Sequence, residues 1–161
     1  MKGGTSDTNC SRCPTTKRTA GIFSTILLYK MLFKNIHEKC QFEIKSEYDL
    51  HCKVVKVLRK KYPEVILIPC MGELQDTSTK RICAYNRGYR SGAPDLLILH
   101  SNQHFCGMAI EFKNPCGTGR LSSKQEDFLN DLHTKCDYQV LVSNDYDEIL
   151  ISIIEYMNID T

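Results

Sequence analysis

The chain has 161 residues, of which 42% are hydrophobic and 25% are charged, and its formal net charge is +2. This balance is that of an ordinary globular domain, and it excludes wholesale disorder and a collagen-like or fibrous chain. The net charge is too small for a histone-like or polybasic protein. Any binding of nucleic acid must therefore depend on a local basic patch.

Nine cysteines are scattered along the chain, and the close pair among them is Cys10 and Cys13. The odd number and the length of the chain favour reduced thiols in an intracellular protein over the disulfide framework of a small secreted domain. A structural zinc site needs four ligands, and no second CxxC motif accompanies this pair. A zinc-based regulatory protein built on Cys10 and Cys13 stays open as an alternative.

Residues 1–39 differ in composition from the rest of the chain. Residues 1–20 are rich in Ser, Thr, Gly and basic residues, which is typical of a mobile tail, and residues 22–33 form an apolar run interrupted by Lys30. This run is too short to span a membrane. We predict a flexible basic tail with a short apolar, helical segment over 1–39 and one domain over 40–161. A signal peptide, a transit peptide and a translation start at Met31 are alternatives for the tail.

From residue 40 the hydrophobic pattern predicts a regular series of helices and strands. A first helix begins at its N-cap Ser46 and ends before Pro63. Two further helices begin after Ser122 and Asp145, each of which is followed three residues later by Gln or Glu in the spacing of a capping box. The apolar and β-branched runs that predict strands are residues 65–68, 95–100, 108–113 and 138–143. This α-β-β-β-α-β-α order predicts an α/β fold with a mixed central sheet flanked by helices.

Two short motifs place charged side chains at the ends of neighbouring predicted strands. Gly92-Ala-Pro-Asp95 opens one strand, and Glu111-Phe-Lys113 ends the next. Glu111 and Lys113 share a face of their strand, and a hairpin would bring Asp95 close to Glu111. Two convergent carboxylates repel each other unless a cation lies between them, and oxygen ligands suit Mg²⁺ or Mn²⁺, which activates water and polarises phosphate. The alternative is a surface ion pair of Glu111 and Lys113 beside an Asp in a turn.

The strings Gly92-Ala-Pro-Asp-Leu96, Glu111-Phe-Lys113 and Gly119-Arg-Leu-Ser-Ser-Lys-Gln125 together resemble the PD-(D/E)XK nuclease superfamily, and within it the VRR-Nuc group. The resemblance covers residues 44–157 and implies a restriction-endonuclease-like core with a metal site at the sheet edge. It implies that Asp95, Glu111 and the backbone carbonyl of Phe112 bind the metal ion. Lys113 would be the catalytic lysine.

The resemblance implies further site residues on the two helices that flank these strands. Gln125 would point into the site and steady the substrate or a water. Glu47 matches a glutamate that the family places on its first helix. The resemblance implies that it is a catalytic residue and a possible metal ligand. The alternative is that Glu47 only provides a favourable negative charge at the N-terminus of the helix. His51 lies one turn later on the same face, where a structural role is favoured. Glu73 corresponds loosely to a further polar position of the family.

Residues 70–92 are polar and contain glycine, which predicts a loop or an irregular hairpin. Basic side chains gather in this segment with Tyr85 and Tyr89 between them, and others flank the glycine-rich turn that follows Glu111-Phe-Lys113. The candidate nucleic-acid contacts are Lys80, Arg81, Arg87, Arg90, Arg120 and Lys124. The alternative is a solvated loop with ordinary charges.

These motifs predict a Mg²⁺- or Mn²⁺-dependent deoxyribonuclease that hydrolyses phosphodiester bonds. The resemblance implies structure-selective cleavage of branched DNA, such as four-way (Holliday) junctions or flaps, by a homodimer. We expect an intracellular protein, in the cytoplasm or nucleus wherever the DNA is processed, without membrane association. The alternative is a catalytically inactive nuclease-like fold that binds nucleic acid or a protein partner.

Overall fold

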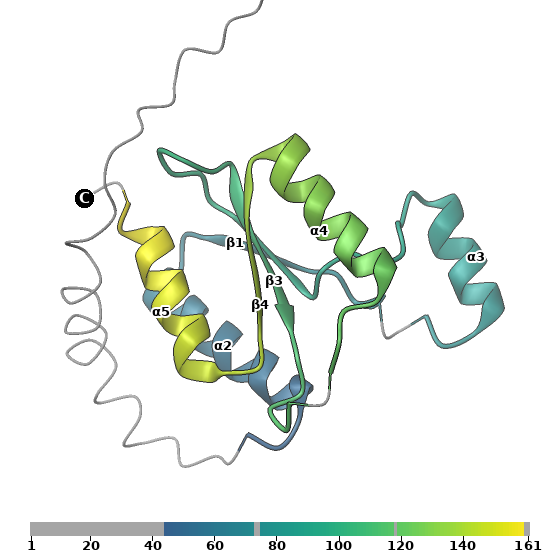
Figure 1. Ribbon diagram of the computed structural model, residues 1–161, viewed down its shortest axis with the longest axis horizontal. Helices are drawn as coiled ribbons and strands as arrows, with labels where there is room; N and C mark the ends of the chain where they lie inside the picture. Colours follow the sequence, from purple (N-terminus) through teal and green to yellow (C-terminus); the bar gives the residue numbers. More distant parts are fainter. Residues whose placement is uncertain (1–43, 73–74, 118, 160–161) are drawn as a thin grey trace, which may run out of the picture.

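The computed structural model describes residues 44–159, except 73–74 and 118. The predicted tail over 1–39, Cys10, Cys13 and Glu73 lie outside the described residues. Helices and strands follow the predicted order with one addition (Figure 1). The elements are α2 (Glu47–Lys61), β1 (Ile66–Pro69), α3 (Ser78–Asn86), β2 (Leu96–Leu99), β3 (Gly107–Phe112), α4 (Ser123–Cys136), β4 (Tyr138–Ser143) and α5 (Tyr146–Met157).

The four strands form one mixed sheet in the order β1-β2-β3-β4, so the predicted α/β fold with a mixed central sheet is confirmed. Strand β2 is antiparallel to both β1 and β3, whereas β4 pairs with β3 in parallel. A parallel pair needs a crossover connection, and α4 provides it. Strand β3 lies inside the sheet and is buried along its whole length.

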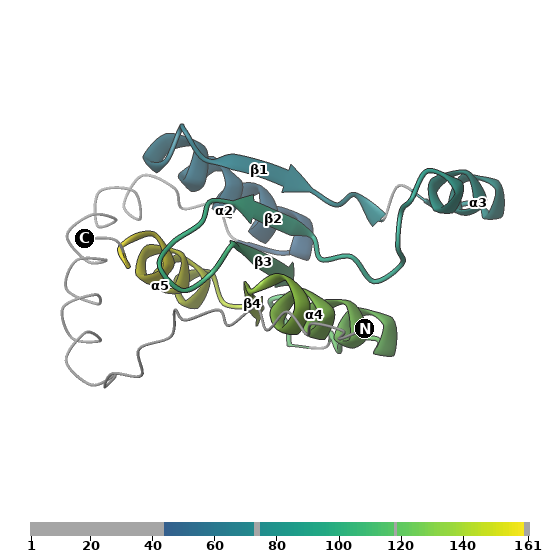
Figure 2. The ribbon, with the colours of Figure 1, turned by 90° about the horizontal axis from the view of Figure 1, so that it is seen from above.

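Adjacent residues of β3 show which helix covers which face of the sheet. The ring of Phe112 stacks on His51 of α2, while the neighbouring Glu111 accepts a hydrogen bond from Gln125 of α4. Because successive side chains of a strand point to opposite faces, α2 and α4 lie on opposite sides of the sheet. Helix α5 joins α2 in a single apolar core with β2 and β3, and Figure 2 shows these helices around the strands.

The first helix follows from its sequence pattern. The side chain of Ser46 accepts a hydrogen bond from the backbone N–H of Asp49 at 3.1 Å, which satisfies one of the free donors of the first turn. Its predicted apolar face is buried, at Leu50, Val54, Val57 and Leu58. The N-cap and the core face of this helix are therefore both confirmed.

The two later capping predictions differ in outcome. Ser122 and Gln125 form the reciprocal capping box at the start of α4. At α5, the Asp145 side chain accepts from the backbone N–H of Glu148 at 2.8 Å, but the Glu148 carboxylate accepts from Ser143 Oγ at 2.5 Å. The backbone N–H of Asp145 donates instead to Ser143 Oγ. The predicted start of the helix is confirmed. The second hydrogen bond of the capping box, from the Asp145 backbone N–H to the Glu148 side chain, is replaced by the bond to Ser143.

The prediction of a loop or hairpin over 70–92 is wrong, because α3 forms within it. Thr77 caps this helix by accepting from the backbone N–H of Lys80 at 3.2 Å. Helix α3 buries none of its residues. Its few apolar side chains stay exposed, so the helix lacks the continuous core face by which a sequence pattern identifies a helix. In the described part of the chain, no helix is long and apolar enough to cross a membrane.

Candidate active site

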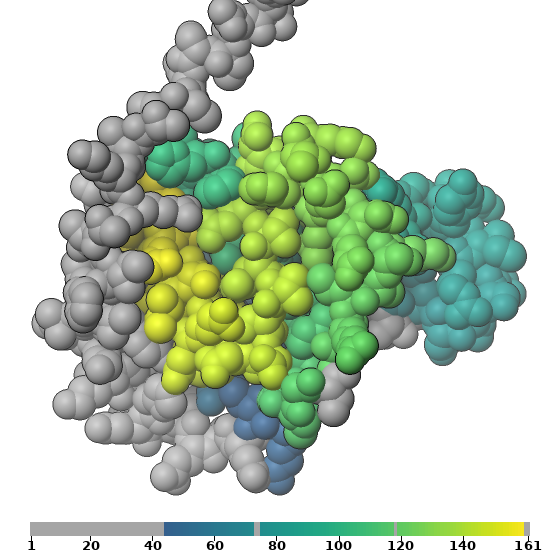
Figure 3. Space-filling model, viewed as in Figure 1, coloured from purple at the N-terminus to yellow at the C-terminus, as the bar shows by residue number. Residues whose placement is uncertain are grey.

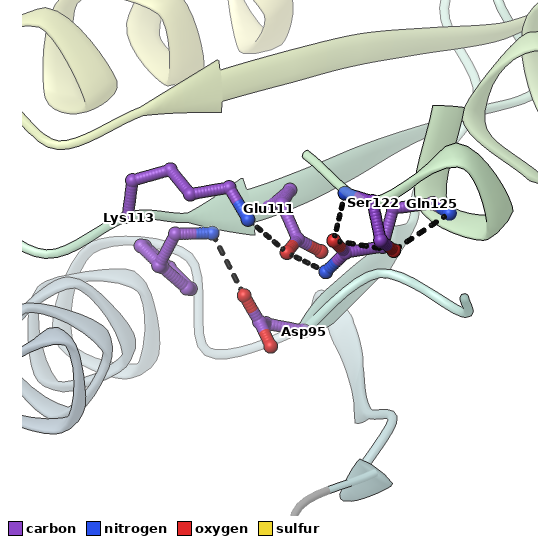
Figure 4. Close-up of polar contacts among 6 residues, drawn as sticks. Asp95, Glu111, Lys113, Ser122 and Gln125 are labelled. Atoms are coloured by element: carbon purple, nitrogen blue, oxygen red, sulfur yellow. Dashed lines mark hydrogen bonds and ion pairs between the residues drawn. The ribbon is translucent and has the colours of Figure 1, made fainter. Parts of the chain in front are cut away.

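The antiparallel pairing of β2 with β3 brings the two charged motifs together. Leu96 pairs with Ile110, so Asp95 and Glu111 lie next to each other at the same end of the two strands. The Oδ2 atom of Asp95 accepts a hydrogen bond from the backbone N–H of Phe112 at 2.8 Å (Figure 4). The proximity that the sequence predicts for Asp95 and Glu111 is therefore confirmed.

The Glu111 carboxylate is the centre of the site and is only 2% exposed. Its Oε1 atom accepts hydrogen bonds from Lys113 Nζ at 2.7 Å and from Gln125 Nε2 (Figure 4). Its Oε2 atom is buried and has no hydrogen-bond partner among the residues that the structure describes. A buried carboxylate oxygen without a donor is costly, so this position favours a ligand that supplies positive charge.

The capping box of α4 fixes the direction in which Gln125 donates. Gln125 Oε1 accepts from the backbone N–H of Ser122 at 2.9 Å and from Ser122 Oγ at 3.0 Å. The amide NH₂ group of Gln125 is thereby left to face Glu111. One side chain thus closes the first turn of α4 and holds the central carboxylate of the site.

The pKa of the Glu111 carboxyl is raised from its ordinary value of 4.5 to about 7, and burial is the largest cause. The charges of Asp95 and Glu47 also raise this pKa, whereas the hydrogen bond and the charge of Lys113 lower it. Desolvation and repulsion therefore outweigh the ion pair. In the protein without a cation, Glu111 changes its charge close to neutral pH.

The donor chemistry suits a hard divalent cation. Asp95 and Glu111 supply carboxylate oxygens and Phe112 supplies a backbone carbonyl. Mg²⁺ and Mn²⁺ prefer these oxygen ligands. The Oε2 atom of Glu111, which has no hydrogen-bond partner among the described residues, fits the role of a metal ligand. Across residues 44–159 with the stated gaps, no three His, Cys, Asp or Glu side chains converge closely enough to hold a metal ion. Glu47 is exposed and affects Glu111 through its charge. The ligand roles stay predictions.

His51 packs beside the site. Its ring stacks on that of Phe112, with the ring centroids 4.6 Å apart and the planes inclined by 24°. Phe112 is fully buried, and His51 covers one side of it. The contact agrees with the structural role that the sequence favours for this histidine.

The basic residues proposed for nucleic-acid contact are divided between two places. Lys80 and Arg81 lie on α3, where Lys80 pairs with Asp76 at 2.8 Å and Arg81 hydrogen-bonds to backbone carbonyls at the start of the helix. Arg120 and Lys124 are exposed beside the start of α4, next to Gln125 in the chain. Lys124 directly precedes Gln125, which contacts Glu111.

Arg87 and Arg90 follow α3 in the chain, and their surroundings differ. Arg87 is the exposed C-cap of α3. Arg90 forms an ion pair with Asp131 of α4 at 2.7 Å, and its guanidinium lies 5.0 Å from the centre of the Phe128 ring. These contacts give Arg90 a structural role in joining the segment after α3 to α4.

Gly92 has a role that sequence reasoning missed, although it belongs to the quoted motif. Its φ is +92°, and an added Cβ would lie 2.2 Å from the backbone oxygen of Lys124 and 2.9 Å from the backbone nitrogen of Gln125. The segment that leads to Asp95 therefore touches the first turn of α4 with no room for a side chain. This contact positions Gln125 opposite Glu111. The signal was present as the glycine three residues before Asp95.

The model of the VRR-NUC domain family matches residues 34–145 of the chain. The chain belongs to the VRR-NUC family. A solved structure described as a VRR-NUC domain protein superposes with a TM-score of 0.58 at 17% sequence identity, covering 71% of this chain and 89% of the other. At that identity the likeness shows a shared VRR-NUC fold. The comparison with curated proteins gave no match.

The predicted resemblance to the VRR-Nuc group is thus confirmed. VRR-NUC is a nuclease-type family, and nucleases of this kind generally use divalent metal ions. The family match includes Asp95, Glu111, Lys113 and Gln125. The site described above therefore lies inside the VRR-NUC domain.

Replacing Gly92 with alanine is expected to destabilise the protein by about 3 kcal/mol, because the Cβ adds a steric overlap to the strain of a positive φ. Gly88 provides a matched control, since its φ is +94° and an added Cβ would meet nothing within 4 Å. Gly88→Ala should cost only about 1 kcal/mol. Denaturant unfolding of both variants measures the difference. Equal losses would show that the approach of Gly92 to α4 does not constrain the fold.

Glu111→Gln is expected to remove a pH dependence of stability. Because the folded pKa of about 7 exceeds the ordinary 4.5, the wild type is most stable relative to this variant below pH 4.5 and loses that advantage as the pH rises to 7. The change should approach about 3 kcal/mol. Denaturant unfolding in EDTA between these pH values tests it, with the exposed Glu155→Gln as a control. Parallel stability curves for wild type and Glu111→Gln would contradict the burial effect.

Proposed function

We propose that the protein is a divalent-metal-dependent deoxyribonuclease that hydrolyses phosphodiester bonds in branched or structured DNA. The observation that carries this proposal is the buried Glu111 beside Asp95, with one oxygen held by Lys113 and Gln125 and the other without a donor. Membership of a nuclease-type family supports it. Mg²⁺ or Mn²⁺ is the cofactor that this donor set favours.

Asp95 and Glu111 would hold the cation, with the carbonyl of Phe112 and the more exposed Glu47 as further ligands. When bound, a divalent cation lowers the pKa of a water and neutralises charge on phosphoryl oxygens. Glu111 is fixed before a cation arrives, because its Oε1 is already held by two donors. Such preorganisation reduces the reorganisation needed at the moment of reaction.

Lys113 supplies the fixed positive charge of the site. Its side chain is 13% exposed and its ammonium group is held 2.7 Å from Glu111, so it ends at the surface where β3 ends. A phosphodiester placed there gains stabilisation of the charge that develops in the transition state. Lys113 would also orient the attacking water. Gln125 acts through Glu111 as a positioning residue.

The exposed side chains of Arg120 and Lys124 lie beside the start of α4, next to Gln125 in the chain. Contacts from such residues to phosphates position the nucleic acid without reading its sequence. We further propose a homodimer, which suits paired incisions at a symmetric junction, acting in the cytoplasm or nucleus wherever this DNA is processed. Family resemblance supports the homodimer, and the scattered cysteines, read as reduced thiols, support the intracellular location.

Lys113→Ala is expected to lower cleavage about 100-fold or more, since it removes charge stabilisation from the transition state. A labelled four-way junction, a flap and a matched linear duplex would be incubated with Mg²⁺, Mn²⁺ or EDTA. Lys60→Ala, an exposed lysine in the last turn of α2, is the control and should cleave like wild type. Paired cuts near the branch that need the metal and Lys113 would support a junction resolvase.

Other outcomes separate the parts of the proposal. Metal-dependent cutting of linear or flap DNA alone would keep the nuclease and discard junction resolution. DNA binding without any cutting would support the inactive nuclease-like fold. That second candidate is favoured by one observation, since no three potential ligand side chains converge within the described residues. Circular dichroism of each variant checks that the fold is retained.

A further inference from the structure

Helix α3 is inserted between β1 and β2 and stands apart from the rest of the domain. It buries none of its residues, and Figures 1 and 2 both show it beyond the N-terminal end of α4. In Figure 3 it forms a separate lobe of the surface. A helix this short gains little stability from its own hydrogen bonds, and its apolar side chains bury no surface against the domain.

The base of α3 is nevertheless fixed to the domain. Arg90 forms an ion pair with Asp131 of α4 at 2.7 Å. The hydroxyl of Tyr89 packs against Gly72, where a Cβ added to the glycine would lie 2.7 Å from the hydroxyl oxygen. Gly92 then touches the backbone of the first turn of α4. The helix therefore projects from a defined place beside the turn that carries Gln125.

The large side chains of α3 gather on one face. Tyr85 is 75% exposed and Ile82 is 61% exposed, and a spacing of three residues places them side by side on a helix. Arg81 lies four residues before Tyr85 and flanks the same face. We name Arg81, Ile82 and Tyr85 the α3 face. Its combination of an aromatic ring, an apolar side chain and a guanidinium is suited to a ligand that has both flat rings and negative charge.

The charge of the surrounding segment decides between kinds of ligand. Residues 77–94 contain four basic residues and no acidic residue. Lys80 pairs with Asp76 and Arg90 with Asp131, so Arg81 and Arg87 carry the excess of positive charge, which favours a polyanion over an apolar protein partner. Basic side chains interspersed with exposed aromatic rings are typical of surfaces on which the bases of a single strand stack.

We propose that the α3 face binds unpaired nucleotides of branched DNA, with the Tyr85 ring stacked on a base and Arg81 contacting a neighbouring phosphate. This inference rests on the proposed nuclease function and assigns the selection of the substrate to the α3 face. In a duplex the faces of the bases are covered by their neighbours, whereas unpaired bases at a fork or flap present theirs. The α3 face thus distinguishes DNA structures without contributing to the chemistry at Glu111.

Binding is measured in a Lys113→Ala background with EDTA, so that cleavage cannot intervene. The probes are a fluorescent short duplex and the same duplex extended by a single-stranded arm. Tyr85→Ala should weaken binding of the armed duplex roughly tenfold and leave the plain duplex unchanged. Tyr85→Phe should bind like the parent because it keeps the ring. Ile66→Ala, which truncates a side chain that is 61% exposed on β1, is the control and should also bind like the parent.

The proposal is overturned if Tyr85→Ala binds the armed duplex as tightly as the parent, or if it loses affinity for both probes equally. A change of oligomeric state in light scattering, without a change in DNA affinity, would identify a protein interface and also overturn it. If the parent binds neither probe, the role of the α3 face is overturned, while the cleavage assay with Mg²⁺ or Mn²⁺ decides the nuclease function separately. If the parent shows the arm preference and Tyr85→Ala abolishes it, the α3 face is the selective surface.

Discussion

The candidate active site depends on one buried carboxylate. Glu111 lies on β3, the strand that is buried along its whole length, and burial alone would favour its neutral form. Two donors, Lys113 and Gln125, hold one of its oxygens, yet the other has no donor among the described residues. An apolar side chain at this position would satisfy the core better. The carboxylate therefore makes sense as a functional group whose cost the surrounding fold offsets.

The surrounding elements are arranged to keep that carboxylate in place. Antiparallel pairing of β2 with β3 brings Asp95 to it, and the backbone of Phe112 holds Asp95 at 2.8 Å. The capping box at the start of α4 orients Gln125, and the absence of a side chain at Gly92 lets the preceding segment touch that same turn. The helix cap and the close backbone contact thus both fix the position of Gln125 relative to Glu111.

The sequence predicts these features where the physical signal is local. The apolar period that predicts the buried face of α2 lies within one helix. The motifs that predict the proximity of Asp95 and Glu111 lie within one hairpin. That Gln125 points into the site is implied by family resemblance alone, because no spacing rule relates a helix to the strand before it, and its contact with Glu111 comes from the structure. The ion pair of Arg90 with Asp131 is not predicted, because its partner lies 41 residues away in the chain. Helix α3 is missed because it is short and buries no residue, so no continuous core face marks it in the sequence.

The chemical site and α3 differ in what a substitution costs. A change on β3 creates a cavity or an unpaired charge in the core, which costs several kcal/mol, so this part of the chain has little freedom to vary. A change at an exposed position of α3 alters few contacts within the domain and costs little stability. The contacts of Arg90 and Gly92 with α4 keep α3 at a fixed position relative to the site, even when residues on its exposed face are substituted. Substrate selection can therefore be adjusted on α3 without disturbing Glu111, which is the physical reason to look for selectivity there.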